Sequence, residues 1–127
     1  SVFHAISGDL KNWQYQNIAL SQPDKVVNDM KRINGYYVMG LHFNTQTVWY
    51  SVSKNDLSTF PAAEVLFTNL GDADKYITSM GWVVNQNADR LMGALYGASN
   101  VPQLDENKIF GVWLQKQVLF MNNETVR

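Results

Sequence analysis

The chain has 127 residues, of which 46% are hydrophobic and 17% are charged, a composition that excludes an intrinsically disordered chain. The net charge of −1 provides no basic surface for nucleic acid or for an anionic membrane. No stretch approaches the roughly 18 consecutive apolar residues of a membrane-spanning helix. We therefore expect a globular domain whose partner is neither nucleic acid nor a membrane.

The absence of cysteine excludes disulfide bonds and thiolate metal sites, but it does not decide the cellular compartment. We expect a secreted or periplasmic location. The chain begins at Ser1 with no initiator methionine and no signal peptide, which predicts a processed chain or a fragment.

The first 20 residues predict two strands joined by a polar turn. The turn, Ser7-Gly8-Asp9-Leu10-Lys11-Asn12-Trp13, follows a strand-like run over residues 2–6. A similar turn, Ser53-Lys54-Asn55-Asp56-Leu57-Ser58-Thr59-Phe60, follows a second strand-like run about 47 residues later. We expect the Asp of each turn to hold the loop by accepting hydrogen bonds from backbone N–H groups. We expect Trp13 and Phe60 to pack between repeated units.

Two longer units follow this partial one. The first covers residues 24–67, with strands predicted over 26–30, 36–43, 47–53 and 62–67 and an Asn34-Gly35 hairpin turn. The second covers residues 74–121, with strands predicted over 77–84, 90–96, 109–115 and 118–121. Met39-Gly40-Leu41-His42-Phe43 returns as Met92-Gly93-Ala94-Leu95-Tyr96 about 53 residues later, which supports the alignment of the two units.

A repeat near 50 residues with four strands predicts an all-β fold made of β-propeller blades, each a four-stranded antiparallel unit. The whole chain, residues 1–127, is then a single propeller segment with a partial blade over 1–20 and blades over 24–67 and 74–121. Two and a half blades do not close a ring. We expect further blades from a longer chain, a second chain or a self-associated copy.

The turn from Ser7 to Trp13, the hairpin from Asn28 to Met39 and the turn from Ser53 to Phe60 resemble the five-bladed propeller glycoside hydrolases of families 43 and 32. The resemblance implies a funnel lined by the first strand of each blade, in which acidic residues cleave a glycosidic bond. One carboxyl group then protonates the leaving oxygen, while another attacks the anomeric carbon or activates water.

This resemblance makes Asp29, on the predicted inner strand of the unit 24–67, the catalytic candidate. The alternative is a structural ion pair with Lys31 or Arg32. The matching inner strand of the third unit, residues 76–82, contains no acid, so the other catalytic acids are expected elsewhere.

Three further residues are candidates for binding substrate. Trp82 offers a ring for sugar stacking, with a core position as the alternative. His42 lies on a second strand, where a partly buried structural role is the alternative. Asp74 is expected on the rim of the funnel, where a solvated loop without calcium is the alternative.

No metal and no cofactor are expected. The two histidines, His4 and His42, lie far apart in a chain without cysteine, and no EF-hand spacing, phosphate loop or nucleophile elbow is present. The sequence therefore favours part of a propeller glycoside hydrolase that acts on a polysaccharide or oligosaccharide. The alternatives are a non-catalytic, lectin-like carbohydrate-binding propeller and a structural or protein-binding propeller segment.

Overall fold

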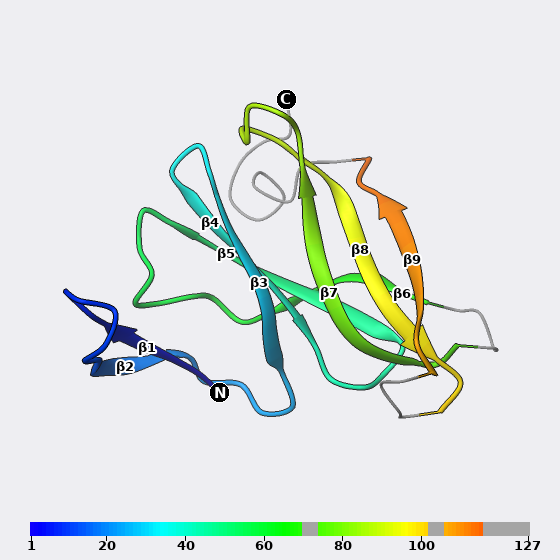
Figure 1. Ribbon diagram of the computed structural model, residues 1–127, viewed down its shortest axis with the longest axis horizontal. Helices are drawn as coiled ribbons and strands as arrows, with labels where there is room; N and C mark the ends of the chain where they lie inside the picture. Colours follow the sequence, from blue (N-terminus) through cyan, green and yellow to red (C-terminus); the bar gives the residue numbers. More distant parts are fainter. Residues whose placement is uncertain (70–73, 102–105, 116–127) are drawn as a thin grey trace.

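The computed structural model describes residues 1–69, 74–101 and 106–115 (Figure 1). Within these ranges the regular structure is β-strand throughout, which confirms the all-β fold. The nine strands are β1 Val2–Ile6, β2 Gln14–Leu20, β3 Val26–Ile33, β4 Tyr36–His42, β5 Thr47–Lys54, β6 Glu64–Thr68, β7 Tyr76–Val84, β8 Leu91–Ser99 and β9 Lys108–Trp113. No helix in the described part of the chain is long and apolar enough to cross a membrane.

The strands form three antiparallel sheets, each following the order of the chain. The first sheet pairs β1 with β2, the second has the order β3-β4-β5-β6, and the third has the order β7-β8-β9. The sheets do not close into a ring. The two-stranded and four-stranded sheets agree with the units predicted over residues 1–20 and 24–67. The strand predicted over 118–121 lies outside the described residues.

The boundaries of the second sheet follow from its turns. Asn34 and Gly35 both have positive φ, at 50° and 81°, which is the backbone conformation of the tight turn that best continues the twist of a hairpin. The carbonyl of Gly35 also accepts a hydrogen bond from the N–H of Asn55 at 2.7 Å, which ties this turn to the next one. β3 accordingly runs on to Ile33, three residues beyond the predicted end.

The second sheet lies between the other two, as Figure 1 shows, and buries both of its faces. One face packs on β7–β9 in a cluster whose fully buried members include Ile33, Val38, Val48, Tyr50, Ile77 and Leu91. The other face packs on β1–β2 through Met39, Leu41 and Phe60, which meet Ala19 and Leu20. The alternation of side chains along β4 explains this division, because successive residues of a strand point to opposite faces.

Hydrogen bonds to the Asp of each repeated turn stabilise that turn, as predicted. The carboxylate of Asp9 accepts hydrogen bonds from the N–H groups of Asn12 at 2.8 Å and Lys11 at 2.9 Å. These bonds, that of Asn12 first, hold the pKa of Asp9 far below its usual range. Asp56 accepts the N–H and the hydroxyl of Ser58 in the same way.

Phe60 and Trp13, the aromatic residues of the two turns, differ in their burial. Phe60 is buried, and its N–H donates to the carbonyl of Ala19 at 2.9 Å, so it packs between sheets as predicted. Trp13 was predicted to do the same, but 59% of it is exposed. Trp13 lies in the turn before β2, and neither core cluster of the described residues includes it.

Candidate functional site

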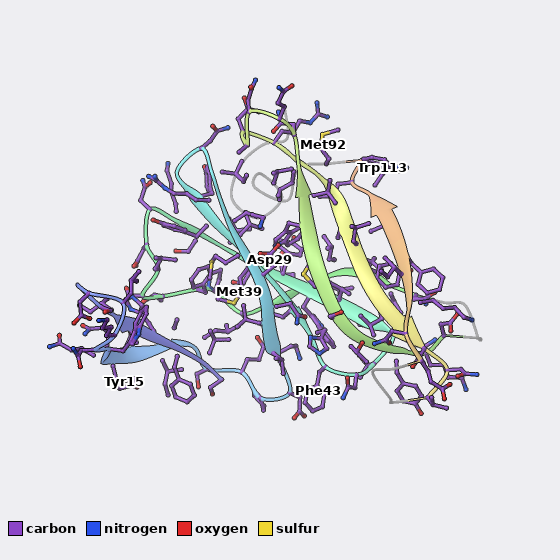
Figure 2. All side chains as sticks on the ribbon, in the orientation of Figure 1. Tyr15, Asp29, Met39, Phe43, Met92 and Trp113 are labelled. Carbon is purple, nitrogen blue, oxygen red and sulfur yellow. The ribbon has the colours of Figure 1, made fainter. Side chains whose placement is uncertain are left out.

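Asp29 lies at an irregularity in the pairing of β3 with β4, where Asn28 has no register partner. Such a bulge re-aims the side chains beside it. Asp29 is the first member of a row across the second sheet, in which it pairs with Gly40, Gly40 with Tyr50, and Tyr50 with Glu64. Residues in one cross-strand row share a face, so Asp29 points toward the third sheet. Figure 2 shows it beside β7.

Both carboxylate oxygens of Asp29 are occupied. One oxygen, Oδ1, accepts the N–H of Met30 at 2.8 Å and pairs with the ammonium of Lys31 at 3.2 Å. The other, Oδ2, accepts the backbone N–H of Trp82 at 2.8 Å. The ion pair with Lys31 is the structural alternative expected from the sequence. The bond to Trp82 was not expected, and it joins the first strands of two sheets.

Glu64 and Asp74, the acids of the second and third sheets considered as partners for Asp29, both lie beyond catalytic distance from it. Glu64 is three strand spacings away, about 14 Å, and accepts the Tyr50 hydroxyl at 2.8 Å. Asp74 lies before β7, whose first residue, Tyr76, is about 20 Å along the strand from Trp82. Glycoside hydrolysis needs two carboxyl groups roughly 5 to 9.5 Å apart. Neither Glu64 nor Asp74 therefore forms a catalytic acid pair with Asp29.

Trp82 is a core residue, with 6% of its surface exposed. A Cβ placed on Gly40 would lie 3.1 Å from its ring nitrogen, which shows that the indole lies directly over the backbone of β4. That nitrogen has no hydrogen-bond partner among the described residues. The ring is thus not available as a platform on which a sugar could stack, and the core alternative applies.

His42 is also buried, with 8% of its surface exposed, and lies at the end of β4. Its Nδ1 is hydrogen bonded to Oδ1 of the exposed Asn28. Burial lowers the pKa of His42, so the ring is neutral at neutral pH. Because Nδ1 of the neutral ring donates to Asn28, Nε2 remains as an acceptor for one hydroxyl group of an uncharged ligand.

Asp74 lies just before β7, and 12% of its side chain is exposed. It forms an ion pair of 3.5 Å with Lys108 on β9, and its backbone carbonyl accepts the side-chain amide of Asn69 at 2.9 Å. Burial, and then the charge of Asp74, raise the pKa of Tyr96. The side chain is therefore held against the third sheet and is not a freely solvated loop residue.

The fold brings His42 and Asp74 to the same end of the stacked sheets. The connection after β4 reaches β7 directly, because the N–H of Ile77 donates to the carbonyl of Thr45 at 2.9 Å. β3 and β7 both begin at this end, which lies at the bottom of Figure 1, and Phe43 marks it in Figure 2. Asp29 and Trp82 lie farther along the same strands.

The same end of the sheets carries a group of polar side chains around Gly97 that the sequence did not predict. A Cβ placed on Gly97 would lie 3.1 Å from Oγ of Ser79, 3.7 Å from Oγ1 of Thr78 and 3.8 Å from Cγ of Asn107. Oγ1 of Thr78 and Oδ1 of Asn107 are buried and lack a hydrogen-bond partner among the described residues. Unpaired buried oxygens cost free energy, so a water molecule or a ligand hydroxyl is their expected partner. The one indication of this polar group in the sequence is Gly97, because a residue without a side chain leaves room for the polar side chains opposite it.

The described residues contain no group of three or more acidic or histidine side chains that could hold a metal ion. A groove of about 320 Å³ runs along the first turn, where it is lined by Ile6, Ser7, Gly8, Asp9, Asn12 and Gln14. Its one carboxylate, Asp9, is committed to the N–H groups of its own loop. This groove offers no catalytic acid.

Comparison of the chain with protein families, curated proteins and solved structures found no match. Three features of the chain itself bear on its function: the arrangement of the sheets, the polar residues at one end of them and the turns that resemble those of propeller glycoside hydrolases.

Proposed function

We propose that the chain is a segment of a β-propeller that binds carbohydrate and that its described residues do not hydrolyse it. The observation that carries the proposal is the stacking of three antiparallel sheets, face on face and in chain order, with the four-stranded sheet covered on both sides. Neighbouring propeller blades have this relationship. In this proposal β3 and β7 are the inner strands of adjacent blades.

The ligand class is argued from the turns that resemble those of propeller glycoside hydrolases and from two separate polar groups, one around His42 and one around Gly97, at the end where β3 and β7 begin. Asn28, His42, Thr78 and Asn107 offer amide, imidazole and hydroxyl groups. Asp74 adds a carboxylate that is paired with Lys108. Neutral hydrogen-bond donors and acceptors of this kind suit the hydroxyl groups of a sugar, because a neutral sugar has no charge that would attract it to a charged site.

Binding is favoured over catalysis because of Asp29. Both of its oxygens serve contacts within the protein, and neither Glu64 nor Asp74 lies within catalytic range. Hydrolysis would require carboxyl groups from outside the described residues.

The test is a panel of neutral oligosaccharides, with binding followed by NMR line broadening and hydrolysis by release of reducing ends. Asn28→Ala removes the exposed partner of His42 and is expected to weaken binding at least tenfold. Asn87→Ala is the matched control, because Asn87 lies in the turn between β7 and β8 at the opposite end of the sheet.

Retained oligosaccharide without new reducing ends supports the proposal. Reducing ends that disappear in Asp29→Asn, with the fold intact, would identify a glycosidase instead. Failure to bind any sugar of the panel, or equal losses in Asn28→Ala and Asn87→Ala, would overturn carbohydrate binding at this end.

A further inference from the structure

Polar side-chain atoms that are buried without a hydrogen-bond partner gather at one place in the third sheet. The described residues contain three such atoms, which are Oγ1 of Thr78, Oδ1 of Asn107 and Nε1 of Trp82. Two of these side chains lie around Gly97, where a Cβ would be 3.7 Å from Oγ1 of Thr78 and 3.8 Å from Cγ of Asn107. Because each unpaired buried oxygen costs free energy, two of them beside one glycine indicate a site for a ligand.

A bulge in β7 aims the hydroxyl group of Thr78 at this site. The pairing of β7 with β8 shifts between Ile77 and Ser79, so Thr78 has no register partner. Such bulges re-aim side chains and are frequent next to functional sites. β3 carries an irregularity at the same place, because Asn28, like Thr78, is the third residue of its strand and has no register partner. The first strands of both sheets therefore aim a polar side chain near the same end.

Ser79 marks the side on which the site meets solvent. Thr78 is only 9% exposed, whereas Ser79 is exposed, and its Oγ lies 3.1 Å from the Cβ position at Gly97. Gly97 alternates along β8 with Tyr96 and Ala98, which are buried toward the second sheet, so it lies on the opposite side of the strand. A ligand therefore reaches Thr78 beside Ser79, from the face of the third sheet that points away from the second.

The side chains around Gly97 determine the chemistry of the ligand. The amide oxygen of Asn107 only accepts hydrogen bonds, whereas the hydroxyl groups of Thr78 and Ser79 donate or accept them. A ligand hydroxyl suits this set, because it donates one hydrogen bond and accepts others. The three side chains nearest to a Cβ at Gly97 are all neutral, so they offer a charged group no partner of opposite charge.

We propose that Thr78, Ser79 and Asn107 form a subsite that binds one hydroxyl group of the ligand and discriminates against the same ligand without it. The inference rests on the proposed carbohydrate binding and names the group of the sugar that this subsite takes. The discrimination arises because an analogue without the hydroxyl group leaves the buried oxygens unpaired. Asn28 and His42 are bonded to each other and form a separate polar group, so each group is tested by its own variants.

The first measurement is the stability of Thr78→Val in urea, without any sugar. This change removes the unpaired hydroxyl group and keeps a branched side chain, so the urea midpoint is expected to stay the same or to rise. Ser51→Ala is the matched control, because the buried hydroxyl of Ser51 donates to the carbonyl of Pro61 at 2.6 Å and its removal is expected to lower the midpoint. An equal fall in both variants would show that an ordered structural water pairs with Thr78, and it would overturn the proposal.

The second measurement compares methyl glucoside, methyl galactoside and methyl mannoside with their singly deoxygenated derivatives, by NMR titration. In the wild type, loss of the hydroxyl group that occupies the subsite is expected to weaken binding by about tenfold or more. In Thr78→Val the parent sugar is expected to bind about tenfold more weakly, and its advantage over that derivative is expected to disappear. Thr78→Ser keeps the hydroxyl group and is expected to keep the discrimination.

The outcomes distinguish this inference from the proposed function. Equal binding of the parent sugar by Thr78→Val and the wild type, or equal binding of every deoxygenated derivative and its parent by the wild type, would overturn the hydroxyl subsite alone. Carbohydrate binding at Asn28 and His42 would then stand. A wild type that binds no sugar of the set would overturn the proposed function and the subsite with it. Coupling between Thr78 and one hydroxyl group of the sugar, with an unchanged or raised urea midpoint, supports both.

Discussion

The carboxylate of Asp29 on β3 accepts the backbone N–H of Trp82 on β7 at 2.8 Å, across the boundary between two sheets. β7 is the first strand of its sheet, so its outer edge has no neighbouring strand there to accept its N–H groups. Asp29 supplies an acceptor at one such position. The residue that the sequence marks as a catalytic candidate thus links the first strands of two adjacent sheets.

Asp29→Ala is expected to lower the free energy of unfolding by about 2 to 3 kcal/mol, because it leaves the N–H of Trp82 without its charged acceptor. Urea denaturation measures the loss. Lys31→Ala is the control and is expected to cost less than about 1 kcal/mol, since 38% of the Lys31 side chain is exposed to solvent. Equal stabilities of Asp29→Ala and the wild type would show that the link between the sheets contributes nothing.

Gly40→Ala is expected to destabilise the chain by about 1 to 3 kcal/mol, because the new methyl group meets the sulfur of Met80. In a Met80→Ala background the same change is expected to cost at least about 0.5 kcal/mol less, since the colliding atoms are gone. Gly8→Ala is the control, because nothing lies within 4 Å of a Cβ at Gly8. A double-mutant cycle in urea measures the coupling, and strict additivity would contradict the contact.

His42 is expected to make stability depend on pH in the mildly acidic range. Its pKa in the folded chain is lowered by burial, so the unfolded chain binds the proton first as the pH falls. Stability therefore decreases below about pH 6.5, the ordinary pKa of histidine. His42→Gln is expected to make the urea midpoint depend less on pH between about pH 5 and 8. His4→Gln is the control, and a dependence that follows His4 instead would refute the assignment.

Asp9 is expected to contribute to stability at lower pH. Because its folded pKa is depressed by backbone N–H donors, its contribution is present above the unfolded pKa of about 4 and disappears as the pH falls through the folded value. Asp9→Ala is expected to reduce the acid-induced loss of stability, as followed by thermal unfolding. Lys11→Ala is the control, because it retains the Asp9 carboxylate and the backbone N–H groups that donate to it. An unchanged acid profile in Asp9→Ala would show that these bonds do not hold the turn.

Local chemistry explains which elements could be predicted. The Asn34-Gly35 turn, the repeated Asp-Leu turns and the returning Met-Gly pair depend on residues near them in the chain, and they correctly located the strands of the first and second sheets. The exposure of Trp13 was not predicted, because it depends on which sheets lie beside β1–β2 and not on the turn itself. The polar group around Gly97 was missed for the same reason, since it joins β7, β8 and the residue before β9.

The sequence by itself determined that the chain is all-β, where its hairpins turn and that its units repeat, because the alternation of side chains and turn residues acts over a few positions. The tertiary structure alone decided which contacts the candidate residues make. It set Asp29 against the backbone of β7, placed the ring of Trp82 over Gly40 and brought His42 to the same end as Asp74. These relationships join residues tens of positions apart, and they depend on how the faces of the sheets stack.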